Sequence, residues 1–492
     1  GAGRYWNINS AGNAVYYCRT TASEPKASLM VYDLKEKKET FLGAYGSYII
    51  SSDKKKMVIN DGGKYAVSDL PKTKLELKDY TDLSNMKVWV NLKEEWKQIF
   101  TESWRQMRDF FYDPGMHGVN WKAIYKKYEP LTAYVNHRAD LTYLIGEMIG
   151  ELSVGHAYTG GGDKPEAAKI KMGLLGATIT KDKSGYFKIE KILRGENWTN
   201  NTRSPLTEVG VDVKEGDYII AVNGKSVINT KNIYELLVNT AGEQVELTVN
   251  STASDQGAHK VIVIPAEDES GLYYYNWVQS NIKKVNDATN GRVGYIHIPN
   301  MGVEGLNEFV KHFYPQLSKN ALIIDDRGNG GGNVSPMIIE RLNRELVYMK
   351  IARNTSQATA GIGQQYGPKI CLIDQYSASD GDLFPYQFKE LKIGKLVGQR
   401  TWGGVVGIRG SLPLIDGGFL NKPEFAHYDA TGKKWIIEGH GVDPDVVIIN
   451  DPAKEYAGED EQLNKAIELI LEELKKVDTK LPPIPEFPDK TK

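Results

Sequence analysis

The spacing of hydrophobic and polar residues changes several times along the chain, and each change marks a different kind of predicted structure. Residues 1–78 show short apolar runs between turn-forming residues, which predicts β-strands. Apolar residues recur at helical spacing within 79–168, and strand-like runs return over 169–266. From 267 to 450, buried strands alternate with helical patterns, and 451–492 combine an amphipathic helix with a proline-rich tail. The predicted fold is therefore multidomain, with α+β parts and a mostly parallel α/β domain.

The first segment has strand-like runs at 15–17, 29–32 and 57–59. These runs and their turns are typical of the last one or two blades of a β-propeller. Two blades can neither close a ring nor bury both of their faces. We therefore expect this segment either to pack on the rest of the chain or to continue a larger region upstream.

The second segment is predicted to be a small helical domain with helices at 94–111, 121–128 and 138–152. It ends at His156, which follows the last helix and precedes a glycine-rich turn. A lone histidine is usually structural, but this position would leave the imidazole accessible.

Length and composition narrow the class of protein. A chain of 492 residues is too long for one core, so about three or four domains are expected. The net charge of -2 offers no electrostatic case for binding nucleic acid or an anionic membrane. No apolar run reaches the ~18 residues of a membrane span. Only Cys18 and Cys371 are present, so no disulfide framework is expected. The cysteine content therefore does not indicate the cellular compartment. The first residue is not Met, which suggests a trimmed chain, from which any signal peptide or upstream domain would have been removed.

A strand, a turn and a helix meet around Ser379. The apolar run 370–373 predicts a buried parallel strand, and a helical pattern follows the serine. Such a junction lifts a serine hydroxyl above the sheet edge and directs backbone N–H groups toward the same space. That suits acyl transfer. Ser379 or Asp380 acting only as a helix cap explains the same residues, and the two roles are compatible.

A second buried strand, within 321–333, runs into three consecutive glycines. These glycines lack the Gly-Lys-Ser/Thr ending of a P-loop and the spacing of a dinucleotide-binding loop. What remains is a flexible turn whose N–H groups can approach a ligand closely.

Together, the motif Asp-x-Arg-x-Asn-Gly-Gly-Gly at 325–332 and the motif Ser-x-Ser-Asp-Gly-Asp at 377–382 resemble those of one group of serine peptidases. This group includes the tail-specific C-terminal processing peptidases and the tricorn protease. The resemblance covers about residues 90–450 in matching order. Within it, 208–224 closely resembles the PDZ signature, and 232–238 suits the PDZ helix. The resemblance implies peptide capture by strand addition at an open sheet edge. The predicted carboxylate-binding loop consists of Gly173, Leu174, Leu175 and Gly176. A PDZ domain without a free groove, serving as a spacer, is the alternative.

The resemblance also bears on the catalytic base. C-terminal processing peptidases activate their serine with a lysine, and Gly404 occupies that place here. Arg400 is nearby but is a poor proton acceptor. Tricorn-type enzymes take a histidine from the helical domain and a glutamate from late in the chain, and His156 and Glu438 match those motifs. Since a PDZ-like segment separates His156 from Ser379, the helical domain must fold back over the carboxyl edge of the sheet.

The same resemblance makes Ser379 the nucleophile and places the oxyanion donors at the N–H groups of Asp380 and Gly331. One departure concerns Gly155, where the tricorn pattern has a serine that links the histidine to the glutamate. Glu438 then reaches His156 directly, through water, or not at all. His440, two residues after Glu438, is a rival base. No His/Cys cluster has zinc spacing, and neither a metal nor a cofactor is expected.

The sequence thus predicts a tricorn-like serine endopeptidase or oligopeptidase that acts on peptide substrates. The alternative is a catalytically inactive peptide-binding scaffold of the same fold. The resemblance is compatible with a homo-oligomer and implies a cytoplasmic location, whereas a removed signal peptide would make the protein periplasmic.

Overall fold

The computed structural model describes residues 3–21, 24–356, 358–359, 363–410, 412–477 and 482–491. Leu481, the first residue of the predicted proline-rich tail, lies outside the described residues. The chain divides into two compact units, Gly1–Asn91 and Leu92–Lys492, and each is described by itself.

The first unit consists of two four-stranded antiparallel sheets, each in sequential strand order. The first sheet contains β1 (Arg4–Ala11), β2 (Ala14–Thr20), β3 (Ser28–Asp33) and β4 (Lys38–Gly43). The second contains β5 (Ser47–Ile50), β6 (Lys56–Asp61), β7 (Lys64–Asp69) and β8 (Tyr80–Thr81). The two sheets share one apolar core, in which Cys18 is buried as a free thiol. Each sheet is a four-stranded meander, as the blade-like pattern of the sequence predicts.

The second unit begins with a helical part made of α1 (Leu92–Phe110), α2 (Trp121–Tyr128) and α3 (Arg138–Gly150), with the short 3₁₀ helices η1 (Met116–Gly118) and η2 (Glu129–Tyr134). Its core also contains Leu414 and Leu420, which come from late in the chain. The strand β9 (Thr159–Gly160), directly after His156, pairs with β23 (Phe419–Leu420), which pairs with β22 (Leu412–Pro413). Arg138 forms a buried ion pair with Asp416 in the turn between β22 and β23. Apolar burial and this ion pair therefore join the helical part to a late segment of the chain.

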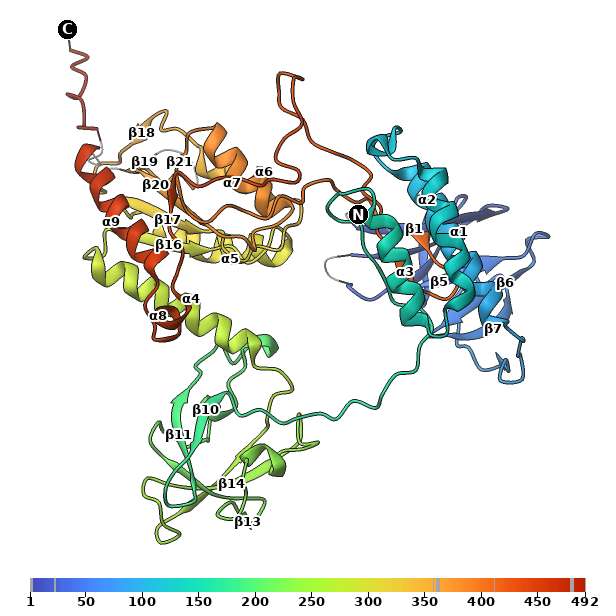
Figure 1. Ribbon diagram of the computed structural model, residues 1–492, viewed down its shortest axis with the longest axis horizontal. Helices are drawn as coiled ribbons and strands as arrows, with labels where there is room; N and C mark the ends of the chain where they lie inside the picture. Colours follow the sequence, from blue (N-terminus) through green and yellow to red (C-terminus); the bar gives the residue numbers. More distant parts are fainter. Residues whose placement is uncertain are drawn as a thin grey trace. The chain divides into compact units, whose positions relative to one another are not determined.

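The PDZ-like part is a sheet in the order β10 (Ala177–Lys181), β11 (Phe187–Ile192), β12 (Tyr218–Val222), β14 (Val245–Asn250) and β15 (His259–Val263), with β13 (Lys225–Ser226) paired to β12 (Figure 1). Three short 3₁₀ helices accompany it: η3 (Asn200–Thr202), η4 (Pro205–Thr207) and η5 (Ile233–Leu236). The helix predicted at 232–238 is only the single turn η5. Its continuation is replaced by a bridge between Met172 and Val238, and the Asn239 N–H donates to the Lys171 carbonyl.

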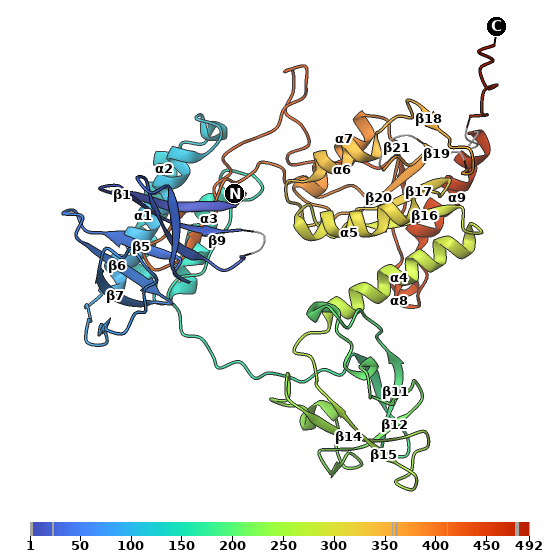
Figure 2. The same cartoon turned by 180° about the vertical axis from the view of Figure 1, so that it is seen from behind.

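The α/β part is a five-stranded parallel sheet in the order β16 (Val293–His297), β17 (Ala321–Asp325), β20 (Lys369–Ile373), β21 (Gly394–Gly398) and β24 (Val446–Val447). Helices α4 (Ser270–Ala288) and α9 (Glu461–Lys476) cover one face, and α5 (Val303–Phe313), α6 (Ser335–Leu342) and α7 (Asp380–Glu390) cover the other (Figures 1 and 2). Every residue of β16, β17 and β20 is buried, as expected for parallel strands covered on both faces. The remaining elements are η6 (Tyr314–Gln316), α8 (Pro452–Tyr456) and the small pair β18 (Met349–Lys350) and β19 (Ala358–Thr359).

These parts confirm the predicted fold class. They also bring both serine-peptidase-like motifs to neighbouring strand ends, because the glycine-rich loop follows β17 and Ser379 follows the adjacent strand β20. The helical pattern after Ser379 predicts that Leu383, Phe384 and Phe388 share one buried face, but Leu383 is only partly buried and lines a pocket beside Ser379.

Candidate active site

Ser379 is the residue at which the turn after β20 becomes helix α7. It occupies the N-cap position with φ 60° and ψ -120°, a backbone conformation that a residue with a Cβ rarely adopts. Such strain stores about 1–3 kcal/mol and persists only where neighbouring contacts impose it. Here the Ser377 Oγ donates to the Asp326 carbonyl at 2.8 Å and the Ala378 N–H donates to the Asn329 carbonyl at 2.8 Å. The turn before Ser379 is therefore held against the loop that follows β17.

The glycine-rich loop passes so close to Ser379 that a side chain would not fit. A Cβ on Gly331, whose φ is +88°, would lie 2.6 Å from the Cβ of Ser379. Asn329 holds this loop: its Nδ2 donates to the Ile298 carbonyl at 3.0 Å, and its Oδ1 accepts the Gly331 N–H at 2.9 Å. The predicted oxyanion donor Gly331 is thus already engaged. Its neighbour Gly332 lines the pocket beside Ser379.

Asp382 is a site residue that the sequence analysis missed. It is buried, and its Oδ2 accepts the Ser379 N–H at 2.8 Å while its Oδ1 accepts the Gly403 N–H at 2.7 Å. Burial raises the pKa of Asp382 to about 6, although these hydrogen bonds stabilise the carboxylate and so act to lower the pKa. The signal was available, since Ser379-x-x-Asp382 has the spacing of a capping box at a helix start. Asn329 is part of the motif at 325–332, but the motif alone did not indicate that its side chain holds the loop.

His156 follows α3 with a positive φ of 59° and is half-buried. Burial lowers its pKa, and the charge of Glu438 opposes that shift. Its Nδ1 is buried without a hydrogen-bond partner among the described residues. The ring lies 5.9 Å from the ring of Trp402, centroid to centroid. The imidazole is therefore favoured in its neutral form, which is the form a general base requires.

Glu438 lies beside His156, but its carboxylate binds backbone groups. Oε1 accepts the Gly155 N–H at 2.8 Å, and Oε2 accepts the N–H groups of Val405 at 2.7 Å and Val406 at 2.9 Å. In the described part of the chain no hydrogen bond joins Glu438 to the ring of His156 or His156 to Ser379. Glu438 thus anchors the backbone next to the histidine and supplies a nearby negative charge.

His440, the rival base, is exposed. Its Nε2 lies 2.7 Å from Asp443 Oδ2, and its Nδ1 lies 3.5 Å from an Arg400 nitrogen. It is not among the residues that line the pocket beside Ser379. Geometry therefore favours His156 for the base.

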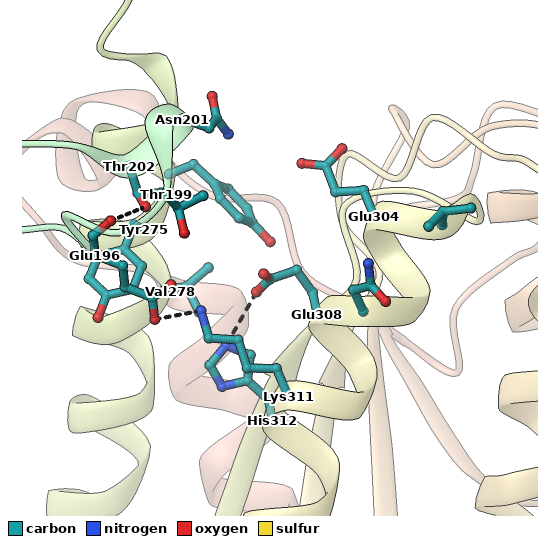
Figure 3. Close-up of a pocket in the computed structure, with 13 residues that line it drawn as sticks. Glu196, Thr199, Asn201, Thr202, Tyr275, Val278, Glu304, Glu308, Lys311 and His312 are labelled. Carbon is teal, nitrogen blue, oxygen red and sulfur yellow. Dashed lines mark hydrogen bonds and ion pairs between the residues drawn. The ribbon is translucent and has the colours of Figure 1, made fainter. Parts of the chain in front are cut away.

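Ser379 and His156 line the same pocket, of about 480 Å³. A second pocket of similar volume lies between the loop around η3 and helices α4 and α5, and neither Ser379 nor His156 lines it (Figure 3). Glu196 and Lys311 form an ion pair across it at 2.8 Å, whereas Glu308 and His312, which approach to 3.3 Å, both belong to α5. The second pocket therefore lies at a polar interface between the PDZ-like part and α5.

The predicted carboxylate-binding loop of the PDZ-like part is internally occupied. The N–H groups of Gly173 and Leu174 donate to the carbonyls of Leu237 and Ala266, at 2.9 and 2.8 Å. The Gly176 N–H donates to Glu269 Oε2 at 3.1 Å, so a carboxylate of the chain itself lies at this loop. Leu175 is buried in the PDZ core. By contrast, β10 lies at the edge of its sheet.

Neither a metal-binding cluster nor a membrane-spanning helix is present among the residues that the structure describes. No group of three or more His, Cys, Asp or Glu side chains in this part of the chain is arranged to hold a metal ion. Within the same residues, no helix combines the length and apolar character needed to cross a membrane.

Comparison with known proteins gives three family matches. Residues 92–150 match the Tricorn protease C1 domain, residues 173–268 the Tricorn protease PDZ domain, and residues 292–448 Peptidase family S41. The tricorn protease homolog 1 of Streptomyces coelicolor is 34% identical over 98% of this chain and 47% of its own length. The putative tricorn-like protease C-terminal subunit of Sulfurisphaera tokodaii is 36% identical over 92% of this chain and 53% of its own.

The chain spans about half the length of the curated relatives it matches. The crystal structure of the tricorn protease superposes with a TM-score of 0.87 at 31% identity, covering 96% of this chain and 46% of that one. The matched domains, the relatives and the fold agree, and together they identify the chain as tricorn protease-like, with a C1 domain, a PDZ domain and a peptidase family S41 domain.

Proposed function

We propose that the chain is a serine peptidase that hydrolyses peptide bonds of oligopeptides or unfolded polypeptides through an acyl-enzyme. The observation that carries the proposal is that Ser379 and His156 line one pocket although the whole PDZ-like part separates them in the chain. A strained serine at a helix N-cap, a half-buried neutral histidine and a glycine loop meet there. This combination suits acyl transfer.

In the proposed mechanism, the Ser379 Oγ attacks the carbonyl carbon of the scissile bond while His156 takes the hydroxyl proton. The tetrahedral intermediate collapses as His156 gives that proton to the leaving amine. Water then attacks the acyl ester with His156 again as the base. The negative charge of Glu438 favours the imidazolium that forms, since it raises the pKa of His156. Glu438 would thus act on the charge and position of the histidine and not by a direct hydrogen bond.

The proposed oxyanion hole combines the Asp380 N–H, at the first turn of α7, with an N–H from the glycine loop. Gly331 fits this role by position, because the site of its absent Cβ lies 3.1 Å from the Asp380 nitrogen. Its N–H would have to leave Asn329 when substrate binds. Catalytic hydrogen bonds often tighten only in the substrate complex, and Gly332 offers a neighbouring donor.

The test is labelling of the full chain with a fluorophosphonate probe, followed by mapping of the labelled residue. Labelling of Ser379 that is lost in Ser379→Ala, together with hydrolysis of an unfolded polypeptide, is the expected result. The alternative, an inactive peptide-binding scaffold, draws support from the unpartnered Nδ1 of His156. It predicts peptide binding without labelling or turnover. Assembly into a homo-oligomer is also part of the proposal and is checked by sedimentation of the same sample.

A further inference from the structure

We propose that Asp326 is a positioning residue of the proposed peptidase site. Its carboxyl group orients the amide of Asn329, and Asn329 in turn holds the glycine loop against Ser379. Asp326 directly follows β17 and is fully buried, and the mechanism given above assigns it no part. The inference deepens the proposed function and rests on it.

The hydrogen bonds of the Asn329 side chain fix the orientation of its amide. Nδ2 donates to Asp326 Oδ1 at 2.9 Å and to the Ile298 carbonyl at 3.0 Å, whereas Oδ1 accepts the Gly331 N–H at 2.9 Å. A rotated amide would turn its oxygen toward two acceptors and its NH₂ group toward an N–H. Asp326 thus helps to keep the amide oxygen directed at Gly331.

Asn329 connects the two segments that meet at the nucleophile. Its carbonyl accepts the Ala378 N–H at 2.8 Å, in the turn that leads to Ser379, while its side chain holds Gly331. Asn329 is also fully buried, and a Cβ on Gly381 in the first turn of α7 would lie 2.5 Å from its carbonyl oxygen. A rotation of Asn329 would therefore disturb the glycine loop and the serine turn together. Oxyanion donors act most strongly when they are preorganised, so this disturbance would slow acyl transfer.

The contacts of Asp326 are those of a neutral acid. Its Oδ2 is buried without a hydrogen-bond partner among the described residues. The cation next to it in the chain, Arg327, pairs with Asp325 and Asp460 instead. A buried carboxylate without a counter-charge is far more costly than a buried neutral acid. The proton therefore belongs on Oδ2, which leaves Oδ1 as the acceptor for Asn329.

The surroundings of Asp326 favour the same protonation state. Burial raises the pKa of Asp326 well above the ordinary aspartate range, and nearby carboxylates act in the same direction, while the hydrogen bond from Asn329 opposes them. The titratable side chains around it are Asp325 at the end of β17, Cys371 in β20, Asp374 after β20 and Asp382 in α7. Because asparagine has the shape of a neutral aspartic acid and keeps the acceptor oxygen, Asp326→Asn should preserve the contact with Asn329.

The experiment measures kcat and KM of the full chain and its variants with a fluorogenic peptide that the wild type cleaves. Asp326→Leu has a similar size but no acceptor, and it should lower kcat about tenfold or more with KM unchanged, since the loop acts on the transition state. The conservative variant Asp326→Asn should stay within about twofold of the wild type. A wild-type kcat in Asp326→Leu would show that the Ile298 carbonyl alone orients Asn329, and it would overturn the inference.

The matched control is Asn281→Leu, on the opposite face of the sheet. Asn281 lies in α4, is 2% exposed and donates to the Tyr295 hydroxyl at 3.1 Å. Its replacement also removes a buried polar contact at nearly constant size, so it should lower stability without lowering kcat. An equal loss of kcat in the control would contradict a specific role of Asp326. If Asp326→Leu does not fold, Asp326→Ala should show the same loss of kcat, and a folded alanine variant with wild-type kcat overturns the inference.

The pH dependence of stability reports the protonation state of Asp326 independently of activity. A pKa raised in the folded state means that the folded protein holds the proton more tightly than the unfolded chain. The stability of the wild type relative to Asp326→Asn should therefore fall as pH rises from about 4 to 8. A difference that is independent of pH would show an ionised Asp326 and would overturn the neutral form on which the inference depends.

Fluorophosphonate labelling separates this inference from the proposed function. The rate of Ser379 labelling in Asp326→Leu should fall together with kcat, because the probe also uses the oxyanion donors. Labelling at the same rate in wild type and Asp326→Leu overturns the role of Asp326 alone. A wild-type chain that is neither labelled nor active overturns the peptidase proposal and this inference with it.

Discussion

The backbone N–H of Gly155 donates to Glu438 Oε1 at 2.8 Å, and this contact joins the residue before His156 to a carboxylate far along the chain. The tricorn pattern has a serine at this position, and here a backbone group makes the contact to the glutamate. The Nδ1 of His156 is left without a partner in the described residues.

Replacing Gly155 by serine tests whether a hydroxyl can restore the missing link. A Cβ at this position would lie 3.2 Å from Glu438 Oε1, so a serine hydroxyl could form a hydrogen bond with this carboxylate. The same Cβ would lie only 2.9 Å from the Gly404 Cα. We expect Gly155→Ser to raise kcat several-fold while overpacking lowers the free energy of unfolding by about 1–3 kcal/mol. The control is Gly155→Ala, which adds the same Cβ without the hydroxyl. Equal kcat values for the two variants would show that the added hydroxyl does not link Glu438 to His156.

The pH dependence of kcat/KM should show a limb that rises as His156 loses its proton. Burial lowers the pKa of His156 below the ordinary histidine value of about 6.5, so the limb should lie below that pH. Because the charge of Glu438 opposes this shift, Glu438→Gln should move the limb to still lower pH.

Rates over pH 4.5 to 8, at substrate levels well below KM, provide the measurement. A limb that stays in place in Glu438→Gln would exclude the electrostatic role of this carboxylate. A limb that disappears in His440→Ala would transfer the role of base to His440.

Ser379→Ala should lower peptide hydrolysis by several orders of magnitude while changing stability by only about 1 kcal/mol, the value of a helix cap. Ser377→Ala is the matched control, because its buried Oγ donates to the Asp326 carbonyl at 2.8 Å. The control should lose about 1–3 kcal/mol of stability yet keep fluorophosphonate labelling. Comparable hydrolysis by Ser379→Ala would refute the nucleophile assignment.

Titration of Asp382 should make the free energy of unfolding depend on pH. Burial raises its pKa in the folded protein to about 6, above the ordinary aspartate value of about 3.9, so the folded state holds this proton more tightly than the unfolded state. The free energy of unfolding should therefore fall as pH rises from about 4 to 7, by about 3 kcal/mol from this group.

Denaturant unfolding of wild type and Asp382→Asn at several pH values isolates that contribution. The stability of the wild type relative to the variant should decrease across this window. The variant should also lose activity, since one amide oxygen cannot accept the N–H groups of both Ser379 and Gly403. A difference independent of pH would contradict a buried, titrating Asp382.

Glu269 should compete with peptide carboxylates for the PDZ-like loop. Its Oε2 accepts the Gly176 N–H at 3.1 Å, and burial raises its pKa. We expect Glu269→Ala to bind a fluorescent peptide with a free carboxyl terminus more tightly than the wild type, with no change for the amidated peptide. Glu267→Ala provides the control for a general change of charge, because it also removes one carboxylate, here one that pairs with Lys171. If both peptides bind alike, strand addition at β10 without carboxylate recognition is the better account.

Local sequence determined the elements and the motifs. The helical spacing over 94–111 became α1, and the apolar run 370–373 became most of β20, because the burial of regularly spaced apolar residues selects these structures. The glycines after β17 and the serine motif after β20 were recognisable because strain and close approach restrict which residues fit. Ser379 was named from such a local pattern, whereas the roles of His156 and Glu438 came from the resemblance to tricorn-type enzymes. Asp382 could have been found from its spacing to Ser379.

Only the tertiary structure decided which groups meet. The Gly331 N–H pairs with Asn329, and the Glu438 carboxylate is occupied by three backbone N–H groups, because such bonds depend on where separate loops pass one another. The same holds for the turn η5, whose continuation as a helix is replaced by a bridge to Met172. It also holds for Leu414, directly after β22, and for Leu420 of β23, which both enter the helical core. Contacts between residues hundreds of positions apart leave no periodic trace in either segment, so the pocket that joins Ser379 to His156 appears only in the folded chain.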